Sequence, residues 1–97
     1  MSIQIPDHTT VITVDTSTTA KTIQLPQIST FNGRVITVLD HSHHAKTNNI
    51  TIVSSSGDVI HDNVTTSVLI NNDAGSITFI AIAPNKWRVI AYWNGIF

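Results

Sequence analysis

Three histidines lie close together in one short stretch of the chain, DHSHHAK, which begins at Asp40. His41 and His43 form an H-x-H pair beside Asp40, and His44 follows directly. Imidazole is a common ligand for zinc, nickel, copper and iron, and side chains two positions apart in an extended chain point to the same side. His41 and His43 are therefore candidate metal ligands. The alternative, which we favour, is a solvated polar loop that is rich in histidine.

A second candidate site lies in the C-terminal segment NKWRVIAYWNGIF. Its three rings, Trp87, Tyr92 and Trp93, are candidate binding residues that could stack on a sugar. In a regular strand one face would hold Trp87, Val89, Ala91 and Trp93, and the other face Arg88, Ile90 and Tyr92. Aromatic side chains also contribute large buried areas to cores and interfaces, and we favour that role for this cluster.

The acidic residues are six aspartates, and the chain has no Glu. All six fall at predicted strand ends or turns: Asp7, Asp15, Asp40, Asp58, Asp62 and Asp73. In such places an Asp side chain usually accepts hydrogen bonds from nearby backbone. Glycoside hydrolysis needs two carboxylates held across a sugar bond, and 97 residues leave little scaffold for such a groove. We assign no catalytic residue and do not expect an enzyme.

Composition narrows the class of protein further. The chain has no cysteine, so disulfides and thiolate chemistry are excluded. A net charge of -1 with five Lys and Arg residues offers no basic patch for nucleic acid. No apolar run approaches the roughly 20 residues that span a bilayer, so we expect no membrane insertion. A domain of this size buries a small core, and many such domains are stabilised further by very good packing, a metal or oligomerisation.

Blocks rich in Ile, Val and Thr dominate the rest of the chain and predict β-strands, because β-branched side chains pack well on a pleated surface. Eight strands are expected, at Thr10 to Asp15, Lys21 to Leu25, Arg34 to Asp40, Asn49 to Val53, Asp58 to His61, Ser67 to Ile70, Ser76 to Ile82 and Lys86 to Tyr92. No window shows a helical period. We expect one all-β domain over residues 1–97, with residues 1–9 as an N-terminal arm and 10–97 as an antiparallel, jelly-roll-like sandwich.

Several of these strands are apolar on both faces. In the strand from Arg34, Val35 and Leu39 point one way while Ile36 and Val38 point the other. A strand in a monomeric antiparallel sandwich usually alternates apolar inside with polar outside. Apolar residues on both faces therefore predict a second buried surface, most simply a subunit interface. The alternative is a tightly wrapped sandwich whose central strands are well covered.

Four consecutive segments run VITVDTSTTAKTIQLP, FNGRVITVLD, NNITIVSSSGDVI and SVLINNDAGSITFIAIAPNKWRVI. Their order resembles the small all-β domains of bacteriophage tail fibres, tailspikes and other viral receptor-binding proteins, over nearly all of Val11 to Ile90. The resemblance implies a homotrimer on the virion surface that contacts other virion proteins. Around its threefold axis, three H-x-H pairs would bring six imidazoles together, enough for an axial metal ion. The resemblance supplies no transferable set of binding residues, and beyond that ion we expect no cofactor.

The function expected from the resemblance is that of a structural and attachment module of a fibre or spike. Exposed loops, such as Thr16 to Ala20, Asp40 to Asn48 and Asn71 to Gly75, would recognise a host glycan or protein. One alternative is a purely structural trimerisation or capsid-decoration domain. Another is a monomeric carbohydrate-binding module, which would require an exposed Trp87 or Trp93.

Overall fold

The computed structural model describes residues 2–4, 10–28, 33–82 and 84–94. These residues form nine β-strands: β1 Ser2–Gln4, β2 Val11–Val14, β3 Lys21–Gln24, β4 Val35–Asp40, β5 Ile50–Val53, β6 Val59–Ile60, β7 Ser67–Ile70, β8 Ser76–Ile82 and β9 Lys86–Trp93. Each of the eight predicted strands is present, with bounds that differ by at most two residues. Among the described residues there is no α-helix, and so none that could cross a membrane.

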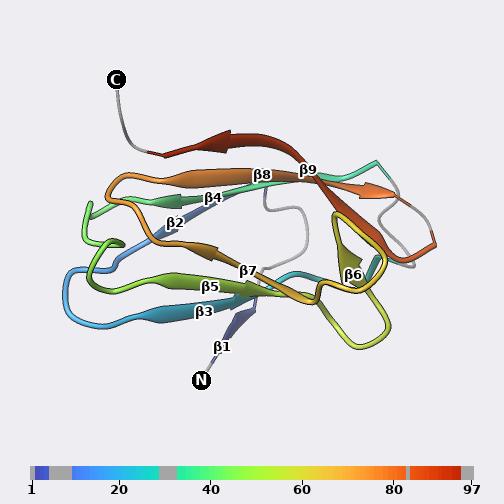
Figure 1. Cartoon of the computed structure of the whole chain (residues 1–97), viewed down its shortest axis with the longest axis horizontal. Coiled ribbons are helices and arrows are strands. Elements are labelled where there is room, and N and C mark those ends of the chain that lie inside the picture. The colour runs from blue at the N-terminus through green and yellow to red at the C-terminus, as the bar shows by residue number, and fades with distance from the viewer. Residues whose placement is uncertain (1, 5–9, 29–32, 83, 95–97) are drawn as a thin grey trace.

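The strands form two sheets that pack as the layers of a sandwich (Figure 1). One sheet has four strands in the order β1-β3-β5-β7, and the other has five in the order β2-β4-β8-β9-β6. From β1 to β8 the chain changes sheet at every connection. The all-β class and the layered arrangement are therefore as predicted.

The prediction of a purely antiparallel sandwich is wrong, because both sheets are mixed. β1 pairs parallel with β3, β3 with β5, β2 with β4, and β6 with β9. From β1 to β5 the physical reason is the repeated crossing, because each strand that returns to its sheet after one crossing in each direction runs the same way as the strand before it. The crossing through β6 is an exception, since β7 runs opposite to β5. Only β4 with β8, β5 with β7 and β8 with β9 are antiparallel. Alternation of apolar residues does not distinguish these two kinds of pairing.

The core lies between the sheets and is built from the inward rows of both. Its largest fully buried side chains are Trp87, Phe79, Ile23, Leu25, Ile28, Ile36, Ile50, Ile52, Ile60, Ile70, Val14 and Val38. The interior is mostly aliphatic with two large rings, so burial of branched side chains supplies most of the driving force.

The expected N-terminal arm is in part an edge strand. β1 adds to the four-stranded sheet in register with β3, with Ile3 beside Ile23. The remainder of the arm, Met1 and residues 5–9, lies outside the described residues, and Asp7 and His8 lie there as well.

Candidate functional site

The outward side of the five-stranded sheet is one candidate surface, called the outer face below. Strand register aligns its side chains: Val11, Thr13, Val35, Thr37, Leu39, Ser76, Thr78, Ile80, Ile82, Lys86, Arg88, Ala91 and Trp93. The pair Val35 and Ile80 brings two branched apolar groups together. Thr37 and Thr78 also face each other, and their hydroxyls form a hydrogen bond of 2.9 Å. This face therefore combines apolar groups and paired hydroxyls, and Arg88 lies beside Ile80.

The two outward surfaces of the sandwich differ in chemistry. On the four-stranded sheet, the outward row is mainly polar: Thr22, Gln24, Thr51, Val53, Ser67 and Leu69. The outer face of the five-stranded sheet has instead exposed Val11, Val35 and Ile82. The apolar residues on both faces of the predicted strands thus correspond to two faces of the five-stranded sheet, one buried in the core and one with exposed apolar side chains.

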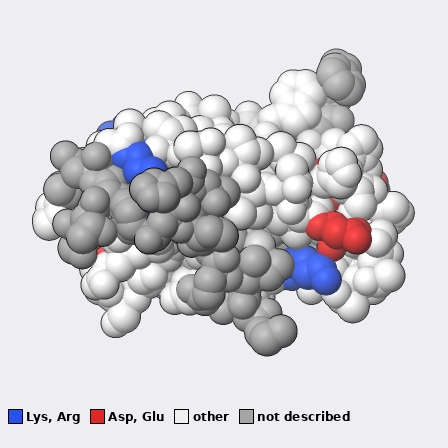
Figure 2. Space-filling view, turned by 180° about the vertical axis from the view of Figure 1, so that it is seen from behind, with Lys and Arg blue, Asp and Glu red and all other residues white. Residues whose placement is uncertain are grey.

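Charged side chains are sparse around this surface. On the outer face the charged residues are Lys86 and Arg88, which lie together toward one end of β9. Charged side chains are also few on the edge of the sandwich that is seen from behind (Figure 2). A face with few charges and several exposed apolar side chains is a candidate protein interface.

A β-bulge changes the facing of the C-terminal aromatic residues. The register between β8 and β9 shifts by one residue at Thr78 and Phe79, so Ile90 is an extra residue. Before the bulge Trp87 faces inward, and after it Tyr92 lies in the inward row beside Ile77 while Trp93 lies in the outward row beside Ser76. The predicted shared face for Trp87 and Trp93 is therefore wrong, because one extra residue reverses the alternation.

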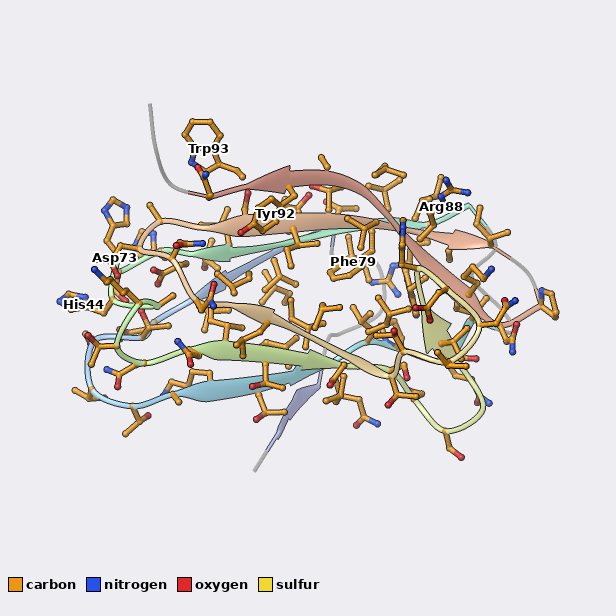
Figure 3. The ribbon with its side chains drawn as sticks, viewed as in Figure 1. His44, Asp73, Phe79, Arg88, Tyr92 and Trp93 are labelled. Atoms are coloured by element: carbon orange, nitrogen blue, oxygen red, sulfur yellow. The ribbon has the colours of Figure 1, made fainter. Side chains whose placement is uncertain are left out.

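The three rings consequently have different surroundings and do not form one platform. Trp87 is fully buried, and its indole N–H donates to the carbonyl of Pro26 at 3.1 Å. Tyr92 is 57% exposed and Trp93 is 40% exposed, and Trp93 extends away from the ribbon (Figure 3). Trp87 is thus a core residue, as the favoured interpretation predicted, and a ligand role stays a prediction only for Tyr92 and Trp93.

A second candidate surface is the end of the sandwich where three loops meet, residues 16–20, 41–48 and 71–75, called the loop end below (Figure 1). These are the loops that the sequence suggested for recognition. They are joined by hydrogen bonds: the amide of Lys46 donates to Asp73 at 2.9 Å, and the Asn48 side chain donates to the carbonyl of Thr16 at 2.7 Å. The fold therefore combines the three segments into one surface.

Asp40 is the buried anchor of the loop end. One carboxylate oxygen accepts the Thr16 hydroxyl at 2.5 Å, and the other accepts the amides of Ala45 and Ala74 at 2.9 and 3.0 Å. Burial acts to raise the pKa of Asp40, but the hydrogen bonds from Thr16, Ala45 and Ala74 outweigh it and lower the pKa below its ordinary value. The buried charge is thereby stabilised, and it connects all three loops.

The histidines lie on the exposed surface of the loop end. His41 and His43 are exposed in a run of turns, and His43 has a φ of 64°, so the extended geometry assumed for the H-x-H pair is absent. A ring nitrogen of His44 lies 2.6 Å from the carbonyl of Ser42. Among the described residues no three potential metal ligands gather. A site at His41 and His43 would thus need further ligands, so their metal role stays a prediction.

The other described aspartates accept backbone hydrogen bonds, which are local for Asp15 and Asp62, as predicted, and come from distant parts of the sequence for Asp58 and Asp73. Asp15 accepts from Ser17, Asp58 from Ile28, and Asp62 from Val64 and Thr65. The backbone amides of Thr65 and Val64, together with the Thr65 hydroxyl, lower the pKa of Asp62 to about 2. Asp15 and Asp62 thus stabilise their own turns, and Asp58 joins two segments that are distant in the sequence.

Comparison with known proteins adds no relative. No family model matches the sequence, and a search of curated proteins gives no match. The functional argument therefore depends on the two surfaces. Sequence reasoning did not find the role of Asp40, although its position at the end of a strand beside a polar loop was visible.

Proposed function

We propose that this chain is a structural and attachment module of a virion fibre or spike, which assembles as a homotrimer through the outer face and presents the loop end to a host glycan or protein. The observation that carries the proposal is the group of exposed apolar side chains on the outer face, Val11, Val35, Ile82 and Trp93. Such a face is costly to leave in water, and a further copy of the chain would cover it.

The size of the chain agrees with assembly through one face. A stable interface buries about 800 Å² per partner. The accessible surface of the chain is 5530 Å², so an interface of that size is about one seventh of it (800/5530). One face of a two-layer molecule can supply that share.

The loop end supports the attachment part of the proposal. Recognition residues commonly lie on loops that a rigid scaffold positions. Here Asp40 holds Thr16, Ala45 and Ala74, one residue from each loop, and the histidines and Asp73 surround that anchor on the surface. Polar, hydrogen-bonding side chains on a fixed framework suit a glycan or a polar protein epitope.

Solution mass across a concentration series tests the proposed assembly. We expect light scattering to give about three times the 10.6 kDa mass of one chain at high concentration. A concentration of about 1 mM is on the order of the weakest dissociation constants of specific complexes. If the mass is that of one chain at all concentrations up to this value, the proposed assembly is overturned. If the chain forms a trimer that binds neither host cells nor a glycan array, the assembly part of the proposal stands and the attachment part is overturned.

A further inference from the structure

The edge of β9 is paired over only a small part of its length. β6 pairs with Lys86 and Trp87, whereas β9 continues to Trp93. In the described ranges, no strand or backbone hydrogen bond is found on that side of β9 from Arg88 to Tyr92. An unpaired edge presents backbone donors and acceptors that can pair with another chain.

Residue His61 is the reason why the pairing stops. Its amide still donates to the carbonyl of Trp87 at 2.7 Å. Its φ is 66°, a left-handed conformation that turns the chain away from β9, and the amide of Asp62 then donates back to Ile60 at 2.7 Å. The carboxylate of Asp62 accepts hydrogen bonds from the amides of Val64 and Thr65, and these bonds hold the chain in its new direction.

The backbone of Val89 lies on the vacated edge. Backbone groups of an antiparallel strand point alternately to its two neighbours. Since the Trp87 carbonyl faces β6, the N–H and C=O groups of Val89, two residues on, face the same side. An incoming strand would therefore take up the place that β6 leaves and would pair with Val89.

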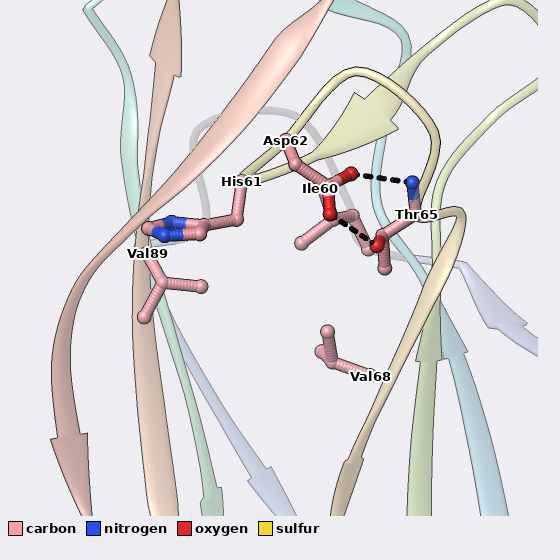
Figure 4. Close-up of a pocket in the computed structure, with 6 residues that line it drawn as sticks. All are labelled: Ile60, His61, Asp62, Thr65, Val68 and Val89. Atoms are coloured by element: carbon pink, nitrogen blue, oxygen red, sulfur yellow. Dashed lines mark hydrogen bonds between the residues drawn. The ribbon is translucent and has the colours of Figure 1, made fainter.

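An apolar pocket of about 310 Å³ opens at this place (Figure 4). It is lined by Ile60, His61, Asp62, Thr65, Val68 and Val89. Val89 on β9 and Val68 on β7 form opposite walls between the two sheets, and Ile60 is fully buried beside them. Residues paired across a sheet point to the same side, so the partner residue beside Val89 would project into this pocket.

The neighbouring positions of an incoming strand would meet positive charge. They would point to the outer face, where Lys86 and Arg88 lie two residues apart on β9. Within the described part of the chain, Arg88 has no ion-pair or hydrogen-bond partner. Charge complementarity thus favours acidic residues on either side of the buried one.

We infer that the edge of β9 beside Val89 is a binding site for an extended segment of a partner protein, which adds as a strand, inserts a branched apolar side chain into the pocket, and places flanking acidic side chains beside Arg88. Main-chain hydrogen bonds supply affinity in this mode of recognition, and the pocket supplies specificity. The site is separate from the loop end. Arg88 belongs to the outer face, so this side of the site is shared with the proposed trimer interface.

A short peptide tests the inference by amide chemical shifts in NMR. The probe is acetyl-Thr-Glu-Ile-Glu-Thr-amide, titrated into the full chain. We expect saturable shifts at Val89, His61 and Val68. Binding should be lost with the same peptide methylated on its backbone nitrogens, and should weaken when Ala replaces the Ile. Equal binding of the methylated peptide would overturn strand addition, as would shifts confined to other surfaces.

The variant Arg88→Glu provides a charge-reversal control at an exposed position. The variant should bind the acidic peptide about threefold more weakly, in line with the strength of exposed ion pairs. It should bind the peptide with Lys in place of both Glu residues more tightly than the unmodified chain does. Preference for the acidic peptide in both proteins would contradict the proposed register. Concentration-dependent shifts at Val89 without peptide would identify a second copy as the occupant and overturn the inference.

Discussion

The Thr16 hydroxyl donates a 2.5 Å hydrogen bond to the buried carboxylate of Asp40. Thr16 lies in the crossover from β2 to β3, and Asp40 is the last residue of β4. The same hydroxyl accepts the amide of His44 at 3.1 Å, so Thr16 connects Asp40 to the histidine loop. These two side chains therefore join the first loop of the loop end to the histidine loop.

Removal of the Asp40 side chain should destabilise the fold strongly. Asp40→Ala leaves the amides of Ala45 and Ala74 without an acceptor and the Thr16 hydroxyl with the Ser42 hydroxyl in place of a carboxylate, and we expect a loss of about 3 kcal/mol or more. Asp40→Asn retains one acceptor oxygen and should cost less. Urea unfolding measures both. Asp73→Ala is the matched control, because the exposed Asp73 accepts a hydrogen bond from Lys46 alone; an equal loss there would contradict the anchoring role.

Stability should depend on pH through Asp40. Burial opposes ionisation, but hydrogen bonds from Thr16, Ala45 and Ala74 prevail, so folding lowers its pKa from the ordinary 3.8. A group of this kind contributes stability that is complete above 3.8 and is lost as pH falls through the lower folded value. Unfolding free energies should thus be level above about pH 5 and fall at lower pH. Asp40→Asn should reduce the slope below pH 4, and an unchanged slope would count against this.

Two neighbouring residues in the loop before β8 should respond in opposite directions to small substitutions. Ala74 has a φ of 61°, which glycine adopts without steric cost, so Ala74→Gly should stabilise by about 0.5 kcal/mol. At Gly75 an added Cβ would lie 2.8 Å from the Ile70 side chain and 3.0 Å from the Asn72 carbonyl. Gly75→Ala should therefore destabilise by about 1 to 3 kcal/mol. Melting temperatures of the two variants check the signs, and the same sign for both would refute this geometry.

The two tryptophans should be distinguishable by fluorescence. Trp93→Phe leaves Trp87, which is fully buried and bonded to Pro26. Its emission should be shifted to the blue and resist quenching by iodide. Ready quenching in the folded variant would show that Trp87 is accessible and would restore it as a ligand-binding candidate.

The sequence predicts the strands well because their signal is local. Each block of Ile, Val and Thr that we identified forms a strand in the structure, and Asn, Gly and Asp mark the turns. The pairing of these strands depends on which sheet receives each one, and that depends on contacts between distant residues. The parallel arrangement of β3 and β5 therefore has no local signature.

The candidate sites show the same division. The apolar character of both faces of β4 was readable, and it corresponds to a buried Ile36 and an exposed Val35. The facing of Trp93 was not readable, because a single extra residue at the bulge reverses it. The pocket beside Val89 also had no sequence signal, since it arises where β6 stops and His61 turns away.

The central claim, assembly through the outer face, is tested most directly by the mass of two matched variants. Val35 on that face is 38% exposed, and Leu69 on the outward side of the other sheet is 44% exposed. Each is replaced by Asp, and light scattering is measured at a concentration where the unmodified chain is assembled. We predict that Val35→Asp has the mass of one chain and that Leu69→Asp retains the trimer mass. A trimer of Val35→Asp together with a monomer of Leu69→Asp would contradict the claim and locate the interface on the opposite layer.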